Sequence, residues 1–112
     1  MPSSESSASG SDRTDLPLAP AGIGLRAYRV LGRVQGVGFR EWTRRTAEGL
    51  GVSGSVRNRE DGSVEVHAAG SEDQLRRLEE ALAKGPLAAR VARIESLTPD
   101  AGMPRSGFRV LY

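Results

Sequence analysis

Cysteine is absent from this sequence of 112 residues, and no stretch is long and apolar enough to cross a bilayer. Without cysteine the chain needs no oxidising compartment, has no thiolate nucleophile and cannot bind zinc through sulfur. We therefore expect a cytoplasmic protein that contacts no membrane and holds no metal.

A strong excess of charge of either sign is also lacking. Sixteen Lys and Arg residues stand against fourteen Asp and Glu residues, which leaves a net charge of +2. This is too small to predict binding to nucleic acid. Lys84 is the only lysine, so arginine carries nearly all the positive charge. The guanidinium fork suits phosphate and carboxylate oxygens, but it serves ordinary surface ion pairs equally well.

Large apolar side chains are scarce in residues 1–24, which are rich in Ser, Gly and Pro and show no periodicity. This composition predicts a disordered N-terminal tail. The segment does not have the basic start and apolar run of a secretory signal, and its acidic residues disfavour a transit peptide. Residues 25–112 suffice for one compact core, so we expect a single domain there, working as a monomer.

The hydrophobic pattern of this domain switches between the strand and helix periods. Strands are predicted at 25–34, 52–58, 63–69, 88–97 and 108–112, and amphipathic helices at 39–51 and 72–84. Ser71 followed by Gln74 is a capping-box signature for the second helix, and Gly85-Pro86 ends it. The order is a split βαβ unit written twice. It predicts an α+β two-layer sandwich with both helices on one face of an antiparallel sheet.

Alternation of side chains also predicts which face each residue joins. Tyr28 and Val30 fall on the same side of the first strand. The strand at 88–97 is less regular, and simple alternation puts Val91 and Ile94 on opposite sides. His67 lies between two core-facing positions, so we expect it on the opposite face of the sheet with a solvated side chain.

The stretch GRVQGVGFR, residues 32–40, joins the first strand to the first helix and places two glycines before an arginine. Gly36 and Gly38 permit positive φ, so successive N–H groups can point inward, and the helix N-terminus and Arg40 add positive charge. The pattern predicts a site for a phosphate or another oxyanion. The alternative is that the glycines only turn the chain and Arg40 is an exposed first-turn residue. The spacing is neither the dinucleotide fingerprint nor a Gly-Lys-Ser/Thr loop.

Asn58 is the only asparagine and stands where the second strand runs into the Asp61-Gly62 turn. Asparagine at a strand end is often only a turn former. In a split βαβ sandwich, however, the second strand can lie beside the first helix, which would bring Asn58 toward the loop before Arg40. Because an amide both donates and accepts hydrogen bonds, it could orient a water molecule there.

The motifs VLGRVQGVGFR, GLGVSGSVRN and REDGSVEV together resemble the acylphosphatase family, and the similarity runs from about Tyr28 to the closing FRVLY. The resemblance implies a ferredoxin-like fold and hydrolysis of acyl phosphates to a carboxylate and inorganic phosphate, without a cofactor. One departure is visible. The family commonly has tryptophan where this chain has Ser55, which we expect to affect the sheet face or the rim of the site rather than the reaction.

The resemblance also implies roles for individual residues. Arg40 corresponds to the phosphate-binding arginine and Asn58 to the asparagine that positions the attacking water. The loop whose backbone amides hold the phosphoryl oxygens corresponds to Gln35, Gly36, Val37, Gly38 and Phe39. The family often ends in an aromatic strand, which suggests that the terminal carboxylate of Tyr112 pairs with Arg40.

Two other functions compete with this one. The same fold could bind nucleic acid or protein through a basic open sheet face made by Arg29, Arg33, Arg57 and His67, although the middle strands present no aromatic side chain there for base stacking. The chain could also be a regulatory domain related to part of a larger carbamoyl-transferring enzyme.

Overall fold

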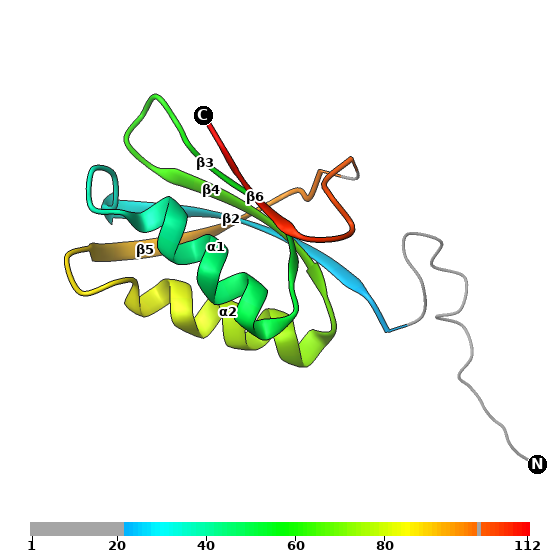
Figure 1. Ribbon diagram of the computed structural model, residues 1–112. Helices are drawn as coiled ribbons and strands as arrows, with labels where there is room; N and C mark the ends of the chain where they lie inside the picture. Colours follow the sequence, from blue (N-terminus) through cyan, green and yellow to red (C-terminus); the bar gives the residue numbers. More distant parts are fainter. Residues whose placement is uncertain (1–21, 101) are drawn as a thin grey trace, which may run out of the picture.

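The computed structural model describes residues 22–100 and 102–112 (Figure 1). Along the chain the elements are β2 (Gly24–Arg33), α1 (Phe39–Leu50), β3 (Ser53–Asn58), β4 (Val64–Gly70), α2 (Glu72–Lys84), β5 (Arg90–Leu97) and β6 (Phe108–Leu111). The order of strands and helices is the one that the hydrophobic pattern predicts. β2 starts at Gly24, and most of the predicted tail, residues 1–21, lies outside the described residues.

The strands form one five-stranded sheet in the order β5-β2-β4-β3-β6. α1 crosses from β2 to β3 over β4, and α2 crosses from β4 to β5 over β2, so both helices lie on one face (Figure 1). The first four of these strands pair antiparallel, whereas β6 pairs parallel with β3 and makes the sheet mixed at that edge. The predicted ferredoxin-like two-layer sandwich is confirmed.

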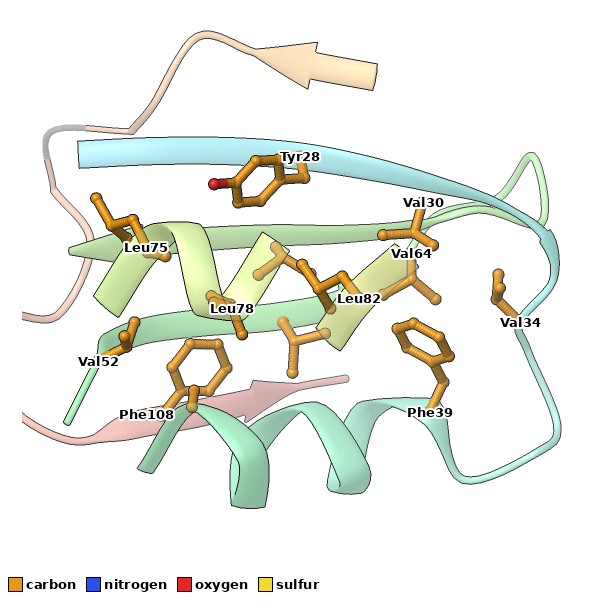
Figure 2. Close-up of a cluster of buried hydrophobic side chains, with 14 residues drawn as sticks. Tyr28, Val30, Val34, Phe39, Val52, Val64, Leu75, Leu78, Leu82 and Phe108 are labelled. Carbon is orange, nitrogen blue, oxygen red and sulfur yellow. The ribbon is translucent and has the colours of Figure 1, made fainter. Parts of the chain in front are cut away.

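The core lies between the helices and the face of the sheet that they cover (Figure 2). Its fully buried side chains come from alternate positions of the strands and from single stripes of the helices, as the 2.0 and 3.6 residue periods require. They include Val30, Val56, Val64 and Val66 from the sheet, Phe39 and Ala47 from α1, and Leu75, Leu78 and Leu82 from α2. Tyr28 and Val30, predicted to share one side of the strand, are both buried in this core.

The two helices have 12 and 13 residues, and none within the described ranges is long and apolar enough to cross a membrane. The predicted capping box begins α2: the Gln74 N–H donates to Ser71 Oγ at 3.1 Å, and the Ser71 N–H donates to Gln74 Oε1 at 2.8 Å. Such a cap contributes about 1 kcal/mol to helix stability. It fixes where α2 starts after β4.

The edge strand β5 does not follow simple alternation. Val30 of β2 faces Ile94, but Gly32, two residues further on, faces Val91, three residues back in β5. The extra residue is a bulge, and it lets both Val91 and Ile94 pack against the core. The prediction that these two side chains lie on opposite sides is therefore wrong, because alternation holds only where the ladder has no inserted residue.

Candidate active site

The loop between β2 and α1 takes the left-handed backbone that its glycines allow. Gly36 and Gly38 both have φ of 76°, and Gly38 is the N-cap residue of α1 with no side-chain cap. The first N–H groups of α1 are thus left without a side-chain acceptor, and the positive end of the helix faces the loop. Apart from each glycine and its two neighbours in the chain, no described atom lies within 4 Å of the place that a Cβ would take, so the loop is open at both positions. This is the geometry of an anion-binding helix start.

Arg40 reaches from the first turn of α1 to the end of the chain. Its Nη1 donates to the carbonyl oxygen of Leu111 at 3.0 Å, and its guanidinium carbon lies 4.5 Å from the centre of the Tyr112 ring. The expected partner was the terminal carboxylate of Tyr112. Among the described residues, the contact is made instead by a main-chain oxygen and by stacking of the planar cation on the ring. No other hydrogen bond or ion pair of the Arg40 guanidinium is found within the described part of the chain.

Asn58 and Arg40 line the same pocket, which has a volume of about 180 Å³. Asn58 is the last residue of β3 and is half-buried. The pocket is lined by Val34, Gly36, Gly38, Phe39, Arg40, Glu41, Asn58, Val110 and Tyr112. The structure thus brings together the two predicted side chains and three of the five predicted loop residues, although 18 positions separate Arg40 from Asn58 along the chain (58 − 40).

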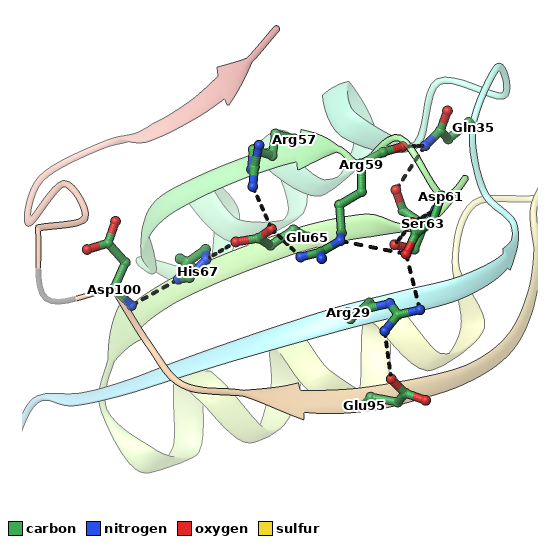
Figure 3. A network of polar contacts seen from close by, with 10 residues as sticks. All are labelled: Arg29, Gln35, Arg57, Arg59, Asp61, Ser63, Glu65, His67, Glu95 and Asp100. Atoms are coloured by element: carbon green, nitrogen blue, oxygen red, sulfur yellow. Dashed lines mark hydrogen bonds and ion pairs between the residues drawn. The ribbon is translucent and has the colours of Figure 1, made fainter.

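The other two predicted loop residues, Gln35 and Val37, do not line this pocket. Val37 packs partly against the core. The Gln35 side chain points to the turn between β3 and β4, where Nε2 donates to the carbonyl oxygens of Arg59 at 2.8 Å and Ser63 at 2.9 Å (Figure 3). Its side chain therefore contacts the turn next to Asn58.

Glu41 lines the pocket and was not among the predicted site residues. Its carboxylate pairs with Arg44 at 2.6 Å, and the hydrogen bond from that guanidinium holds the pKa of Glu41 below its ordinary value. A negative charge therefore lies beside the cation of Arg40. The hydrophobic pattern could not reveal it, because a polar residue in the first turn of a helix is most often surface.

The open face of the sheet carries ion pairs rather than free positive charge (Figure 3). Arg29 pairs with Asp61 at 3.1 Å and Glu95 at 3.4 Å, and both Arg57 and Arg59 pair with Glu65, at 3.0 and 2.8 Å. Three arginines thus meet three carboxylates. The basic surface expected from Arg29 and Arg57 is largely neutralised within the sheet.

His67 lies on this open face, as predicted, but it is not solvated. Its side chain lies under the segment after β5, and the residue is 9% exposed. The Asp100 N–H donates to Nδ1 at 3.1 Å, which puts the ring proton on Nε2, 2.5 Å from the Glu65 carboxylate. Burial raises the pKa of Glu65, but the hydrogen bond from His67 and the charge of Arg57 outweigh it and lower that pKa overall.

Ser55 faces the same side of the sheet as His67, which is its partner on β4. It is 7% exposed and does not line the pocket of Arg40 and Asn58. Within the described ranges, no group of three or more His, Cys, Asp or Glu side chains is arranged to hold a metal ion. The absence of a metal and of a cofactor from the reaction stays a prediction.

Comparisons with known proteins agree with this architecture. The acylphosphatase family profile matches residues 26–110. An acylphosphatase of Nitratidesulfovibrio vulgaris is 55% identical over 69 residues, which are 62% of this chain and 69% of that protein. The structure of an acylphosphatase from Coxiella burnetii is 37% identical with a TM-score of 0.71, over 80% of this chain and 94% of that one. The acylphosphatase structure from Bacillus subtilis is 34% identical with a TM-score of 0.69, over 80% of this chain and 99% of that one. With the profile match covering most of its length, the chain belongs to the acylphosphatase family, hydrolases that act on small-molecule acyl phosphates.

Proposed function

We propose that the pocket of Arg40 and Asn58 is the place where an acyl phosphate is hydrolysed. In this proposal Arg40 and the backbone amides of residues 35–39 hold the phosphoryl group, and Asn58 positions the attacking water. The observation that supports it most is the shared pocket of about 180 Å³, which sits at the N-terminus of α1 and is lined by both side chains.

This reaction does not require a side chain that titrates near neutral pH. Water attacks phosphorus, the bond from phosphorus to the acyl oxygen breaks, and the carboxylate leaves with the electron pair, so the leaving group needs no proton. What remains is to neutralise charge on the phosphoryl oxygens in a loose transition state and to hold one water in line. Backbone N–H groups and a guanidinium suit the first task, and an amide that donates and accepts suits the second.

Hydrolysis of benzoyl phosphate, followed by its absorbance, tests the role of Arg40. The Arg40→Ala variant should lose turnover and also lose inhibition by inorganic phosphate, because the same cation binds both. Arg109→Ala is the matched control. Arg109 is an exposed arginine on β6, the strand next to β3, and it does not line the pocket. Wild-type inhibition by phosphate in Arg40→Ala would remove Arg40 from the proposed site.

The role of Asn58 predicts a different pattern. Asn58→Ala should keep inhibition by phosphate and lose kcat by a hundredfold or more, on the order of 3 kcal/mol, as for the removal of one preorganised transition-state donor. A variant that turns over at the wild-type rate would show that another group positions the water.

The proposal extends to a monomer that works in the cytoplasm without metal or cofactor. Activity that survives a chelator would support a reaction without metal, and activity lost to the chelator would contradict it. Sedimentation at the mass of one chain would support the monomer. Binding of nucleic acid by the open sheet face is the competing function. The ion pairs of Arg29, Arg57 and Arg59 weigh against it, and salt-dependent RNA binding without any hydrolysis would favour it.

A further inference from the structure

β2 leads into the proposed phosphate loop, residues 34–38, and β3, which carries Asn58, leads into the turn of residues 59–63 at the same end of the sheet. β2 ends at Arg33 and β3 at Asn58. The loop of residues 34–38 and the turn of residues 59–63 both project beyond these ends. Asn58 itself pairs with Val64 of β4, so the ladder sets its position. The position of the loop relative to Asn58 depends on what joins the loop to the turn.

The Gln35 side chain links the loop to the turn. Its Nε2 donates to the carbonyl oxygens of Arg59 and Ser63, the first and last residues of the turn, at 2.8 and 2.9 Å (Figure 3). Two carbonyl acceptors fix which end of the amide faces the turn, because only the NH₂ group can donate to both. In the described part of the chain, no other side-chain hydrogen bond links residues 34–38 to residues 59–63.

The turn that receives these bonds is itself well braced. The Arg59 N–H donates to Ser63 O at 2.8 Å, and the Ser63 N–H and Oγ both donate to the Asp61 carboxylate, at 2.9 and 2.5 Å. These bonds lower the pKa of Asp61 and so keep it ionised. Because this braced turn continues directly from Asn58, the bond from Gln35 to the Arg59 carbonyl fixes where the loop lies relative to Asn58.

We propose that the Gln35 side chain is a positioning residue that sets the distance between the phosphate loop and Asn58. This inference rests on the proposed roles of Arg40 and Asn58. The Gln35 amide does not line the pocket, so it acts through the backbone of the turn and not on the substrate. Its function is to keep the water that Asn58 holds in line with a phosphoryl group held by the loop, where a displacement of about 1 Å can cost on the order of a hundredfold in rate.

The test is a double-mutant cycle on benzoyl phosphate hydrolysis with the full chain. Gln35→Ala should lower kcat by tenfold or more. Inhibition by inorganic phosphate should stay within about threefold of the wild type, because Arg40 and the loop amides that bind phosphate are still present. In an Asn58→Ala background the same substitution should change kcat by less than about twofold, because its effect acts through Asn58.

Two control variants separate positioning from general loss of structure. Gln74→Ala removes the hydrogen bond from the Ser71 N–H to Gln74 Oε1 at the start of α2, remote from the pocket, and should lower stability to urea without changing kcat. Gln35→Glu keeps the size of the side chain but loses both donors, so at neutral pH it should be at least as slow as Gln35→Ala.

The outcomes are distinguishable. If Gln35→Ala lowers kcat equally in both backgrounds, or if Gln35→Glu restores the rate, Gln35 only fills space and the inference is wrong while the site stands. Wild-type kcat in Gln35→Ala also contradicts the inference alone. If Asn58→Ala itself is as fast as the wild type, the proposed function fails first and the inference fails with it.

Discussion

At the scale of single residues, Tyr28 is a buried side chain whose hydroxyl has no hydrogen-bond partner among the described residues (Figure 2). Burial and the nearby charge of Glu79 raise its pKa from 10.0 to about 12. Between these two values the unfolded chain loses the phenol proton and the folded chain keeps it. Since the folded state then binds more protons, the free energy of unfolding should fall as the pH rises through this window.

Tyr28→Phe should remove this part of the alkaline loss of stability. Urea unfolding of both proteins across the window measures it, and the difference between them should change in favour of the variant as the pH rises. At neutral pH the variant should be at least as stable as the wild type, because a buried hydroxyl without a hydrogen bond costs free energy that phenylalanine avoids. Parallel stability curves for the two proteins above pH 10 would show that Tyr28 ionises at its ordinary value.

Glu41 places a carboxylate in the pocket beside Arg40, and the hydrogen bond from Arg44 keeps it ionised. Repulsion between this charge and a phosphate should weaken binding, so Glu41→Gln should tighten inhibition by inorganic phosphate. The side chain is 51% exposed and already paired, so the gain should be modest, about two- to fivefold, and should shrink at high salt.

Glu48→Gln is the matched control for Glu41. Glu48 pairs with the same Arg44 at 2.8 Å but does not line the pocket. It should leave phosphate inhibition unchanged. Equal effects of both substitutions would mean that the helix charge acts at long range and that the position of Glu41 in the pocket has no special effect.

At the scale of elements, β3 can pair closely with β4 only because residue 54 is a glycine. Gly54 has φ of 144°, and a Cβ there would overlap the backbone oxygen of His67. Gly54→Ala should destabilise the protein by about 3 kcal/mol or more through backbone strain and displacement of the strand. Urea unfolding measures the loss.

Gly49→Ala gives the matching control for this substitution. Gly49 lies in α1 and has no positive φ, and apart from its chain neighbours and the nearby backbone of its own helix, no described atom lies within 4 Å of the place that an added methyl group would take. Alanine there should therefore stabilise the helix by about 0.5 kcal/mol. Similar losses at both glycines would contradict the close approach of β3 to β4 as the cause.

The elements themselves could be predicted from the sequence because each follows from a local pattern. The capping box of Ser71 and Gln74 fixes where α2 starts, and the stripe of Leu75, Leu78 and Leu82 fixes its buried face. Local pattern fails where a contact comes from elsewhere in the chain. Alternation could not show the bulge of β5, nor the segment after β5 that buries His67.

At the scale of the whole molecule, the split βαβ order was enough to predict that Asn58 approaches the loop before Arg40. The strand after a crossover helix runs parallel to the strand before it, so its C-terminal end lies near the start of the helix. The topology did not reveal which groups complete the site. The hydrogen bond from Arg40 to the Leu111 carbonyl joins residues that are 71 positions apart. The hydrogen bond from Gln35 to the Arg59 carbonyl joins residues that are 24 positions apart. Such contacts depend on side-chain reach between loops, which no periodicity encodes.

At the same scale, we propose that residues 25–112, the domain expected from composition, carry out the whole reaction. Every buried hydrophobic side chain in the described structure lies between Ala27 and Phe108, and the lining of the proposed site runs from Val34 to Tyr112. A chain lacking residues 1–21 still contains all of β2, which begins at Gly24. It should therefore unfold at the same urea concentration as the full chain and hydrolyse benzoyl phosphate with kcat/KM within about twofold, since no part of the described core or pocket is removed. A large loss of kcat/KM with unchanged stability would assign the first 21 residues a part in catalysis, and a loss of both would extend the folded domain toward the N-terminus.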